Sequence, residues 1–547
     1  MKDAAPPPQT ALRPPGDVMR LSRLGAMFPT RLSFLRILTR QLAAENRVPE
    51  RALWQMDADG YGRAVYRITF HGHVYALVAV TRPLDAEARS DRVIATAWDA
   101  AFVLHDGMPD ADDLDRIAQQ APRQEAGRFT ARDLVLSRAN KSVRLWTHVV
   151  ERLRAGRQPE ADFVGQIGYL MRTTAVYGNG KFGIADRAVL AARPGLGLSF
   201  MAEMLTVWLI RHFTHDLVQH VGRAALDPAL KRHLGIGNAT GLGMAPFLVT
   251  HPILLNNWMM VRETALARVR AVETVETGRA QQLRDLHARA AAHLAQWQVP
   301  DAARQVELDT LRQEWAALAP AFEDLSGTAP MERLWQDGQG HRLEVQELLL
   351  SLMLEPFGDL VDDLAAGLTD AVGGTGQAFE TTEDLRAALA QNFSWALGRD
   401  YSQPAACARF WYVSEEKQEP RLGNRFDEPG AERESPLDIA RRIAALADDL
   451  PRRAAPVAAF LQRHPQHLLA VERVQIARAC PYSEIHDNLI DAACRPIDML
   501  RAKLALFGAT KFDPKSDLWT RVTLAQGALM AADMQGGSAQ AGWCPVL

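Results

Sequence analysis

Polar, glycine-rich islands interrupt an otherwise apolar sequence, and they hold residues with the chemistry of a ligand site. The first island, residues 172–183, reads Arg-Thr-Thr-Ala-Val-Tyr-Gly-Asn-Gly-Lys-Phe-Gly. Its glycines permit positive φ angles, so consecutive backbone N–H groups can form an anion-binding nest. Arg172 and Lys181 would add positive charge to such a nest, and Asn179 would add a neutral donor. The competing interpretation is a tight turn between two helices.

A second island, residues 235–243, reads Gly-Ile-Gly-Asn-Ala-Thr-Gly-Leu-Gly and is followed by His251 and Pro252. Proline is favoured at the first position of a helix, so we expect a helix to begin at Pro252 with His251 at its cap. A helix N-terminus offers free N–H groups and a partial positive charge, which Asn238 and Thr240 would complement in binding an anion. The alternative is close helix–helix packing that requires glycine.

Residues 414–435 are the most strongly charged segment, and their prolines and glycines exclude a regular helix. An irregular loop of this kind suits an active-site lid, in which Arg421 and Arg425 would bind a carboxylate or phosphate. The candidates for proton transfer and charge in this loop are Glu415, Glu416 and Lys417. The competing interpretation is a solvated surface loop with internal ion pairs.

A cysteine followed by proline forms the last candidate for chemistry. Pro481 suits the first turn of a helix, which would place Cys480 at the N-cap, where the pKa of a thiol is lowered. His486 lies more than one helical turn away, so a local Cys–His dyad is not expected. The alternative for Cys480 is a small buried apolar side chain.

The sequence lacks the common short motifs that indicate a bound metal ion or cofactor. His212 and His215 have a ligand-like spacing, but they lie in an apolar stretch and the H-E-x-x-H pattern is absent, so we predict no metal site. The chain shows no dinucleotide fingerprint and no P-loop. The cofactor stays unknown, because helical folds can bind flavins without a short motif.

Composition limits the class of protein. The chain has 547 residues, 48% of them hydrophobic and 23% charged, which predicts a soluble globular protein of about two or three domains. A net charge of −3 argues against nucleic-acid binding. Four cysteines without a C-x-x-C pair favour the cytoplasm. The most apolar stretch, residues 196–218, carries too many charges to span a membrane.

The elements that would position these residues begin with a β-hairpin. Residues 64–70 and 74–80 are rich in β-branched and aromatic side chains, and a glycine-containing turn separates them. A third strand is expected within 93–104, and helices are expected at 31–45 and 112–120. These elements make a small α+β unit.

From about residue 137 onward the pattern predicts helix almost throughout. A long helix is expected over 252–297, with Gly278 as a potential interruption and residues 302–318 as its partner. Polar helix starts are expected at 137–142 and 511–519. Further helices are predicted at 345–354, 360–372, 382–391, 436–446, 457–462 and 496–507.

The predicted fold class is therefore mainly α, with a large multi-helix body after a small N-terminal α+β unit that contains a β-hairpin or three-stranded sheet. The predicted domains are a disordered Pro-rich tail (1–16), a small α+β domain (17–135), a helical domain with a long central helix (136–400) and a C-terminal helical region (401–547).

This pattern favours an enzyme that acts on a small anionic metabolite, a carboxylate or phosphate, by proton-transfer chemistry of the lyase or isomerase type. The alternative is a non-catalytic helical binding or assembly protein whose contact surface is the long helices. A projecting helix with an apolar stripe would also favour a homo-oligomer.

Overall fold

The computed structural model describes residues 12–88, 97–120, 130–173, 187–198, 200–241, 251–297, 302–368, 378–409, 436–487, 489, 496–508, 511–512, 519–528 and 530. The chain divides into two compact units, each built from segments that are distant in sequence. The helical unit comprises Met1–Leu32, Leu242–Leu422 and Arg433–Lys503. The sheet unit comprises Ser33–Gly241, Gly423–Glu432 and Leu504–Leu547. The domain boundaries predicted from the sequence stay a prediction.

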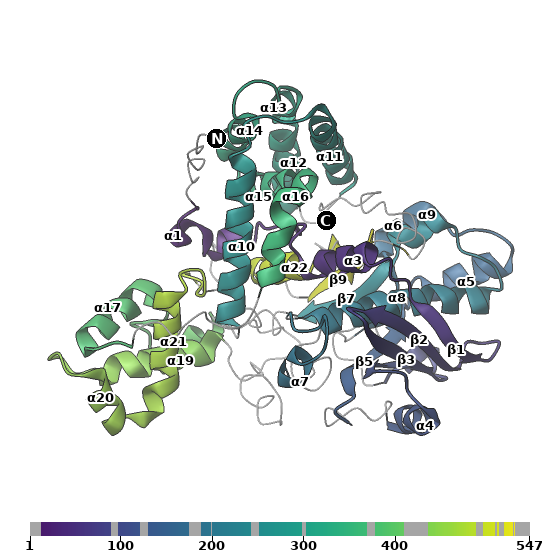
Figure 1. The fold of residues 1–547 in the computed structure, drawn as a ribbon, viewed down its shortest axis with the longest axis horizontal. Helices are drawn as coiled ribbons and strands as arrows, with labels where there is room; N and C mark the ends of the chain where they lie inside the picture. The colour runs from purple at the N-terminus through teal and green to yellow at the C-terminus, as the bar shows by residue number, and fades with distance from the viewer. Residues whose placement is uncertain are drawn as a thin grey trace, which may run out of the picture. The chain divides into compact units, whose positions relative to one another are not determined.

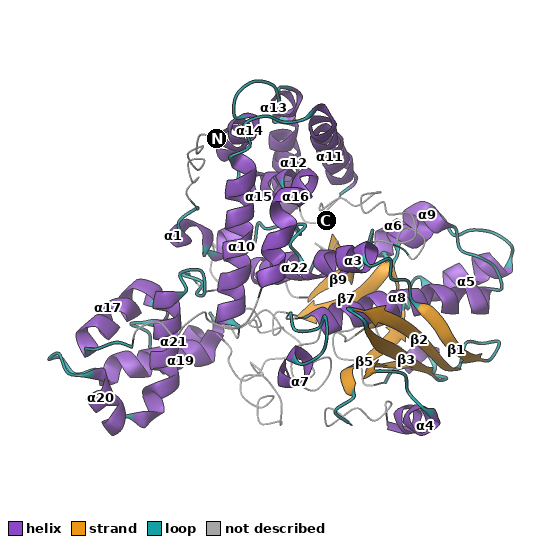
Figure 2. Cartoon of the chain, viewed as in Figure 1, coloured by secondary structure: helices purple, strands orange, loops and turns teal. Residues whose placement is uncertain are grey.

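One sheet dominates the sheet unit (Figure 2). Among the described residues it has nine strands in the order β1-β2-β3-β4-β5-β6-β7-β9-β8, and all neighbours are antiparallel except β6 and β7. The strands are β1 (Glu50–Met56), β2 (Gly62–Phe70), β3 (His73–Thr81), β4 (Ala100–Asp106), β5 (Asp133–Lys141), β6 (Tyr169–Thr173), β7 (Gly235–Gly241), β8 (Lys511–Phe512) and β9 (Trp519–Leu524). The prediction of a mainly α, or all-α, fold with a small N-terminal sheet is therefore wrong.

The predicted hairpin is confirmed as β2 and β3, which pair from Gly62↔Thr81 to Phe70↔His73. The two turn residues have positive φ angles, 49° at His71 and 74° at Gly72, which is the geometry that matches the twist of a two-residue hairpin. The expected third strand is β4, which begins within the predicted segment, at Ala100, and continues beyond it to Asp106. Residues 89–96 lie outside the described part of the chain.

Helices cover both faces of the sheet. The face formed by Val65, Val78, Val103 and Leu136 packs against Ile117 of α4 (Ala111–Gln120). On the other face, Phe213 of α8 (Met201–Gly222) contacts the rings of Tyr66 and Phe102. Nearly every residue of α8 is buried, which explains the apolar stretch that the sequence shows at 196–218.

Three polar or glycine-rich segments are strands instead of helix starts or loops. Residues 137–142, expected to start a helix, belong largely to β5, and the segment 511–519 contributes residues to β8 and β9. The glycine island at 235–243 supplies β7. A Cβ atom at Gly237 would lie 2.7 Å from the ring of Tyr169, so glycine serves a close approach of neighbouring strands.

Further helices of the sheet unit flank these strands, and α3 confirms the helix expected at 31–45. They are α3 (Phe34–Ala44), α5 (Trp146–Arg154), α6 (Ala161–Ile167), α7 (Arg187–Ala191) and α9 (Pro228–His233).

The helical unit is built from α1 (Pro15–Val18), α2 (Leu21–Leu24), α10 (Pro252–Arg270), α11 (Thr277–Gln296), α12 (Ala302–Ala317), α13 (Ala319–Glu323), α14 (Pro330–Gln339), α15 (Leu343–Met353), α16 (Gly358–Val361), α17 (Thr382–Asn392), α18 (Pro404–Ala408), α19 (Pro436–Asp449), α20 (Val457–Arg463) and α21 (Leu468–Ala479) (Figure 1). A last helix, α22 (Pro496–Phe507), crosses the boundary between the two units in sequence.

The helices predicted for this unit are present with two corrections, whereas α14 and α21 were not predicted. The long helix expected over 252–297 is two helices, because α10 ends at Arg270 and α11 begins at Thr277. The break therefore precedes Gly278. The helix expected at 360–372 is shorter and irregular: α16 ends at Val361, and a 3₁₀ segment, η5, follows over Asp362–Gly367.

A network of buried charges holds the N-terminal segment in the helical unit. Arg13 donates two hydrogen bonds of 2.7 Å to the carboxylate of Glu263 on α10, and one of 2.8 Å to Glu347 on α15. Glu347 also accepts hydrogen bonds from Arg23 and Arg262. Both carboxylates are fully buried, so the arginines compensate charges that would otherwise be costly to bury. No helix in the described part of the chain combines the length and apolarity needed to cross a bilayer.

Candidate functional site

Most of the residues predicted to bind or react lie outside the described part of the chain. These residues are Asn179, Lys181, Glu415, Glu416, Lys417, Arg421 and Arg425. For Asn238 and Thr240 the structure describes only the backbone, which belongs to β7. The structure describes the side chains of three predicted residues. These are Arg172 in the sheet unit, and His251 and Cys480 in the helical unit.

Cys480 does not occupy the helix N-terminus that was predicted for it. It is the C-cap of α21, and its N–H donates to the carbonyl of Ile476 at 2.7 Å. Pro481 therefore follows a helix instead of starting one. Burial raises the pKa of the Cys480 thiol, so the thiolate is disfavoured. The local environment removes the physical reason for expecting a reactive cysteine here.

His251 lies where the sequence places it. It is the N-cap of α10, and Pro252 is the first residue of that helix. Its side chain makes no capping hydrogen bond to the helix. The helix start is thus confirmed, and a catalytic role of His251 stays a prediction.

Arg172 is buried at the end of β6, where only 3% of its surface is exposed. In the sheet it pairs with Asn140 of β5, and Ala101 of β4 pairs with Arg138. Because successive side chains of a strand alternate between faces, Arg138, Asn140 and Arg172 lie on the same face. Both guanidinium groups lie over the indole of Trp98, at 4.9 Å for Arg138 and 5.9 Å for Arg172 from the ring centroid.

A clamp of hydrogen bonds fixes the segment that carries Trp98. The N–H of Asp99 donates to Oδ1 of Asn140 at 3.0 Å, and the Asn140 amide donates to the carbonyl of Ala97 at 3.1 Å. The N–H of Lys141 donates to both oxygens of the Asp99 carboxylate, at 3.2 and 3.3 Å. These hydrogen bonds anchor the backbone on both sides of Trp98, at Ala97 and at Asp99. We call Trp98, Asp99, Arg138, Asn140 and Arg172 the Trp98 cluster.

The other face of the same strands carries a hydroxyl pair. Ser137 and Thr173 are buried, and their oxygens lie 2.5 Å apart. Arg172 and Thr173 are the last two residues of β6 and also the first two of the glycine island predicted to form an anion nest. The carboxyl end of β6 thus presents a hydroxyl pair on one face of the sheet and guanidinium groups on the other.

Chemically, the Trp98 cluster suits the recognition of an anion. Guanidinium groups stack on aromatic rings and present flat arrays of N–H donors that match carboxylate or phosphate oxygens. Sequence reasoning found Arg172 but missed Trp98, Asp99, Arg138 and Asn140. The alternation of Arg138 and Asn140 was the available signal, but it was interpreted as the start of a helix.

Two buried histidines of α8 have a different character. Burial and the neighbouring charge of Arg211 lower the pKa of His212 to about 3, and they also lower the pKa of His215. Both imidazoles are therefore neutral at physiological pH. Arg211 itself donates hydrogen bonds to the carbonyls of Leu234 and Ala528, so its role is structural.

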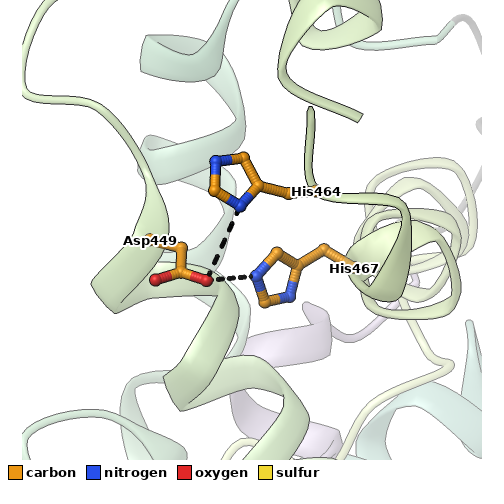
Figure 3. Close-up of side chains that lie close together, drawn as sticks. All are labelled: Asp449, His464 and His467. Atoms are coloured by element: carbon orange, nitrogen blue, oxygen red, sulfur yellow. Dashed lines mark hydrogen bonds and ion pairs between the residues drawn. The ribbon is translucent and has the colours of Figure 1, made fainter. Parts of the chain in front are cut away.

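One group in the described part of the chain has side chains suited to a metal ion (Figure 3). It consists of Asp449, His464 and His467 in the helical unit, and it shares no residue with the Trp98 cluster. Sequence reasoning predicted no metal site and did not single out these residues.

Comparisons of the chain with family models, with curated proteins and with solved structures found no match. The candidate sites therefore rest on geometry and chemistry alone.

Proposed function

We propose that the protein is an enzyme acting on a small anionic metabolite, whose carboxylate or phosphate binds at the Trp98 cluster. The convergence of Arg138 and Arg172 on the ring of Trp98 carries this proposal. Arg138 and Arg172 together outweigh the one carboxylate of the cluster, Asp99, and the net positive charge would attract an anion, whose orientation the indole would restrict.

The reaction that we favour is proton transfer of the lyase or isomerase type. The candidate acids and bases are Glu415 and Glu416, which lie outside the described residues. Binding and chemistry are thus separate parts of the proposal. Binding is tested first, because its residues have a defined geometry.

The alternative, a helical assembly protein, draws less support from the described helices. The apolar residues of α11, including Leu283, Leu286 and Leu294, are buried within the helical unit. His287 of α11 stacks on Trp315 of α12 at a centroid distance of 4.9 Å. These helices therefore cover one another, and among the described residues of α11 and α12 the exposed large apolar side chain is Val306.

Isothermal titration calorimetry with inorganic phosphate, sulfate, malate and citrate tests the binding step. We expect one of these anions to bind, and we expect Arg172→Ala to weaken that binding by about 10- to 100-fold, the loss of one charge-assisted hydrogen bond. Arg172→Lys should recover only part of the affinity, because lysine keeps the charge but not the planar fork.

The matched control is Arg157→Ala, which removes an exposed arginine of the same unit. It should bind as the wild type does, and circular dichroism should confirm that all variants are folded. Equal affinity in the wild type and in Arg172→Ala and Arg138→Ala, or no binding of any anion, would refute the proposal.

A further inference from the structure

Asp449, His464 and His467 converge from two segments of the helical unit (Figure 3). Nε2 of His467 lies 2.8 Å from Oδ2 of Asp449, and Nδ1 of His464 lies 3.9 Å from the same oxygen. The three ligand atoms all lie within 4.8 Å of one another. We propose that these residues bind a single Zn²⁺ ion, and we call them the Asp449 site.

The local fold fixes both histidines. Asp449 is the last residue of α19, His464 follows the last residue of α20, and His467 ends the 3₁₀ segment η7 (Pro465–His467). The N–H of His464 donates to the carbonyl of Phe460 at 2.9 Å, and the N–H of His467 donates to that of His464 at 3.1 Å. This tight turn directs two side chains that are three residues apart toward one point.

The ring of Phe460 packs against the rings of both histidines. It stacks on His464 at 4.8 Å and on His467 at 5.8 Å between centroids. The side chain of His467 is only 5% exposed, whereas those of His464 and Asp449 are 34% and 47% exposed. One ligand is thus held rigidly, while the other two remain accessible to an ion from solvent.

The electrostatics of α19 favour a cation at this point. The C-terminus of a helix carries a partial negative charge, and an acidic side chain there is unfavourable. Helix α19 nevertheless ends with Asp448 and Asp449, and its last turn contains no basic residue. A divalent ion bound to Asp449 would offset both the carboxylate and the helix dipole.

The ligand set selects the kind of metal. Two imidazole nitrogens and one carboxylate oxygen suit Zn²⁺, whereas Ca²⁺ and Mg²⁺ prefer oxygen ligands. Ligands about 2.0 to 2.1 Å from a tetrahedral ion are about 3.3 Å from one another. The two separations from Asp449, 2.8 and 3.9 Å, bracket that value, and all three ligand atoms lie within 4.8 Å of one another, so side-chain rotations would complete the geometry. The fourth position would hold water.

A simpler explanation is that His467 and Asp449 form only a hydrogen bond. His464 distinguishes the two cases, because a hydrogen bond between the other two residues does not need it. His464 is also partly exposed, so replacing it should leave the fold intact.

The test uses the full chain without a histidine tag, freed of metal by a chelator, and titrated with Zn²⁺ against a chromophoric chelator. We expect one high-affinity ion per chain. His464→Ala and Asp449→Asn should each weaken binding by at least about tenfold, since each removes a ligand while Asp449→Asn keeps the side-chain volume. Calcium and magnesium should not compete.

The matched control is His341→Ala, which removes a partly buried histidine of the same unit outside the site. It should bind Zn²⁺ with wild-type affinity. Co²⁺ provides an independent readout, because a tetrahedral site gives intense visible absorption that His464→Ala should abolish. A wild type that binds no Zn²⁺, or wild-type affinity in both His464→Ala and Asp449→Asn, would overturn the proposal.

Discussion

At the scale of single residues, Glu347 shows what a buried charge does in this protein. Its carboxylate is fully buried and bonds to Arg13, Arg23 and Arg262, from the N-terminal segment and from α10. A buried pair contributes little net stability when complete, but removal of one partner leaves an uncompensated charge. The ion pairs of Glu347 therefore add little net stability, but removing Glu347 would strongly destabilise the fold.

We predict that Glu347→Gln lowers the free energy of unfolding by about 3–5 kcal/mol at neutral pH, because three guanidinium groups lose their shared carboxylate. Urea unfolding followed by circular dichroism measures this change. Glu344→Gln on the same helix is the control, since Glu344 forms only a partly exposed pair with Arg342 and should change stability by less than about 1 kcal/mol. Equal effects of the two variants would contradict the role assigned to the network.

The same variant should alter the pH dependence of stability. Burial by itself raises the pKa of the Glu347 carboxyl, but the charges of Arg13, Arg262 and Arg23 outweigh burial and hold it well below its usual value. The wild type therefore gains stability from this group above the unfolded pKa of about 4.3 and loses it as the pH falls toward the folded pKa. Glu347→Gln should lack this part of the acid slope, and urea unfolding at stepped pH values measures it.

At the scale of elements, glycine has the role of bringing strands together. Strand β7 is rich in glycine, and Tyr169 of its parallel partner β6 lies against Gly237. On the other edge, a Cβ atom at Gly235 would lie 2.3 Å from the carbonyl oxygen of Leu524 in β9. Gly235 and Gly237 of the second glycine island are thus explained by the packing of three strands.

We predict that Gly237→Ala lowers the free energy of unfolding by about 1–3 kcal/mol, because the added methyl group would lie 2.7 Å from rigid ring atoms of Tyr169. Thermal and urea unfolding measure the change. Gly278→Ala in α11 is the control: its Cβ would have nothing within 4 Å, and alanine is the better helix former, so stability should stay equal or rise. Wild-type stability of Gly237→Ala would show that β7 can separate from Tyr169.

The sequence predicted elements that carry a local signal. Helix α3 and the hairpin of β2 and β3 were found because their periodicity and turn residues lie within one short segment. Strand β5 was missed because its polar end, with Asn140 and Lys141, resembles a helix start. Strands β6 and β7 were missed because one is short and the other glycine-rich, and because their pairing joins segments that helices separate.

The same distinction applies to the candidate sites. Arg172 was found because it stands beside a glycine island in the sequence. Its partners Trp98 and Arg138 were missed because they meet it only through the register of β4, β5 and β6. The histidines of the Asp449 site lie three residues apart, but their carboxylate comes from the end of another helix. Tertiary placement of this kind leaves no local pattern.

At the scale of the whole molecule, each unit is completed by a segment that is distant in sequence from the rest of that unit. The helical unit includes the N-terminal segment with Arg13, and the sheet unit is completed by residues after Leu504. Strand β9 pairs with β7 from Ile236↔Leu524 to Gly241↔Trp519. The carbonyl of Ala528 accepts a hydrogen bond of 3.0 Å from the buried Arg211 of α8. The sheet unit therefore cannot be completed until its last segment is available to fold.

A chain that ends at Phe507 should consequently lose the stability of its sheet unit, whereas a chain that ends at Met530 should keep it. The shorter chain lacks β8 and β9, which exposes the edge of β7, and it leaves Arg211 without the Ala528 carbonyl. We expect its melting temperature to fall by about 10 °C or more, with early proteolysis within residues 33–241. The chain ending at Met530 keeps both contacts, so it is the matched control for truncation. Equal melting temperatures and equal protease resistance of the two chains would show that β7 and α8 are held in place without the C-terminal segment.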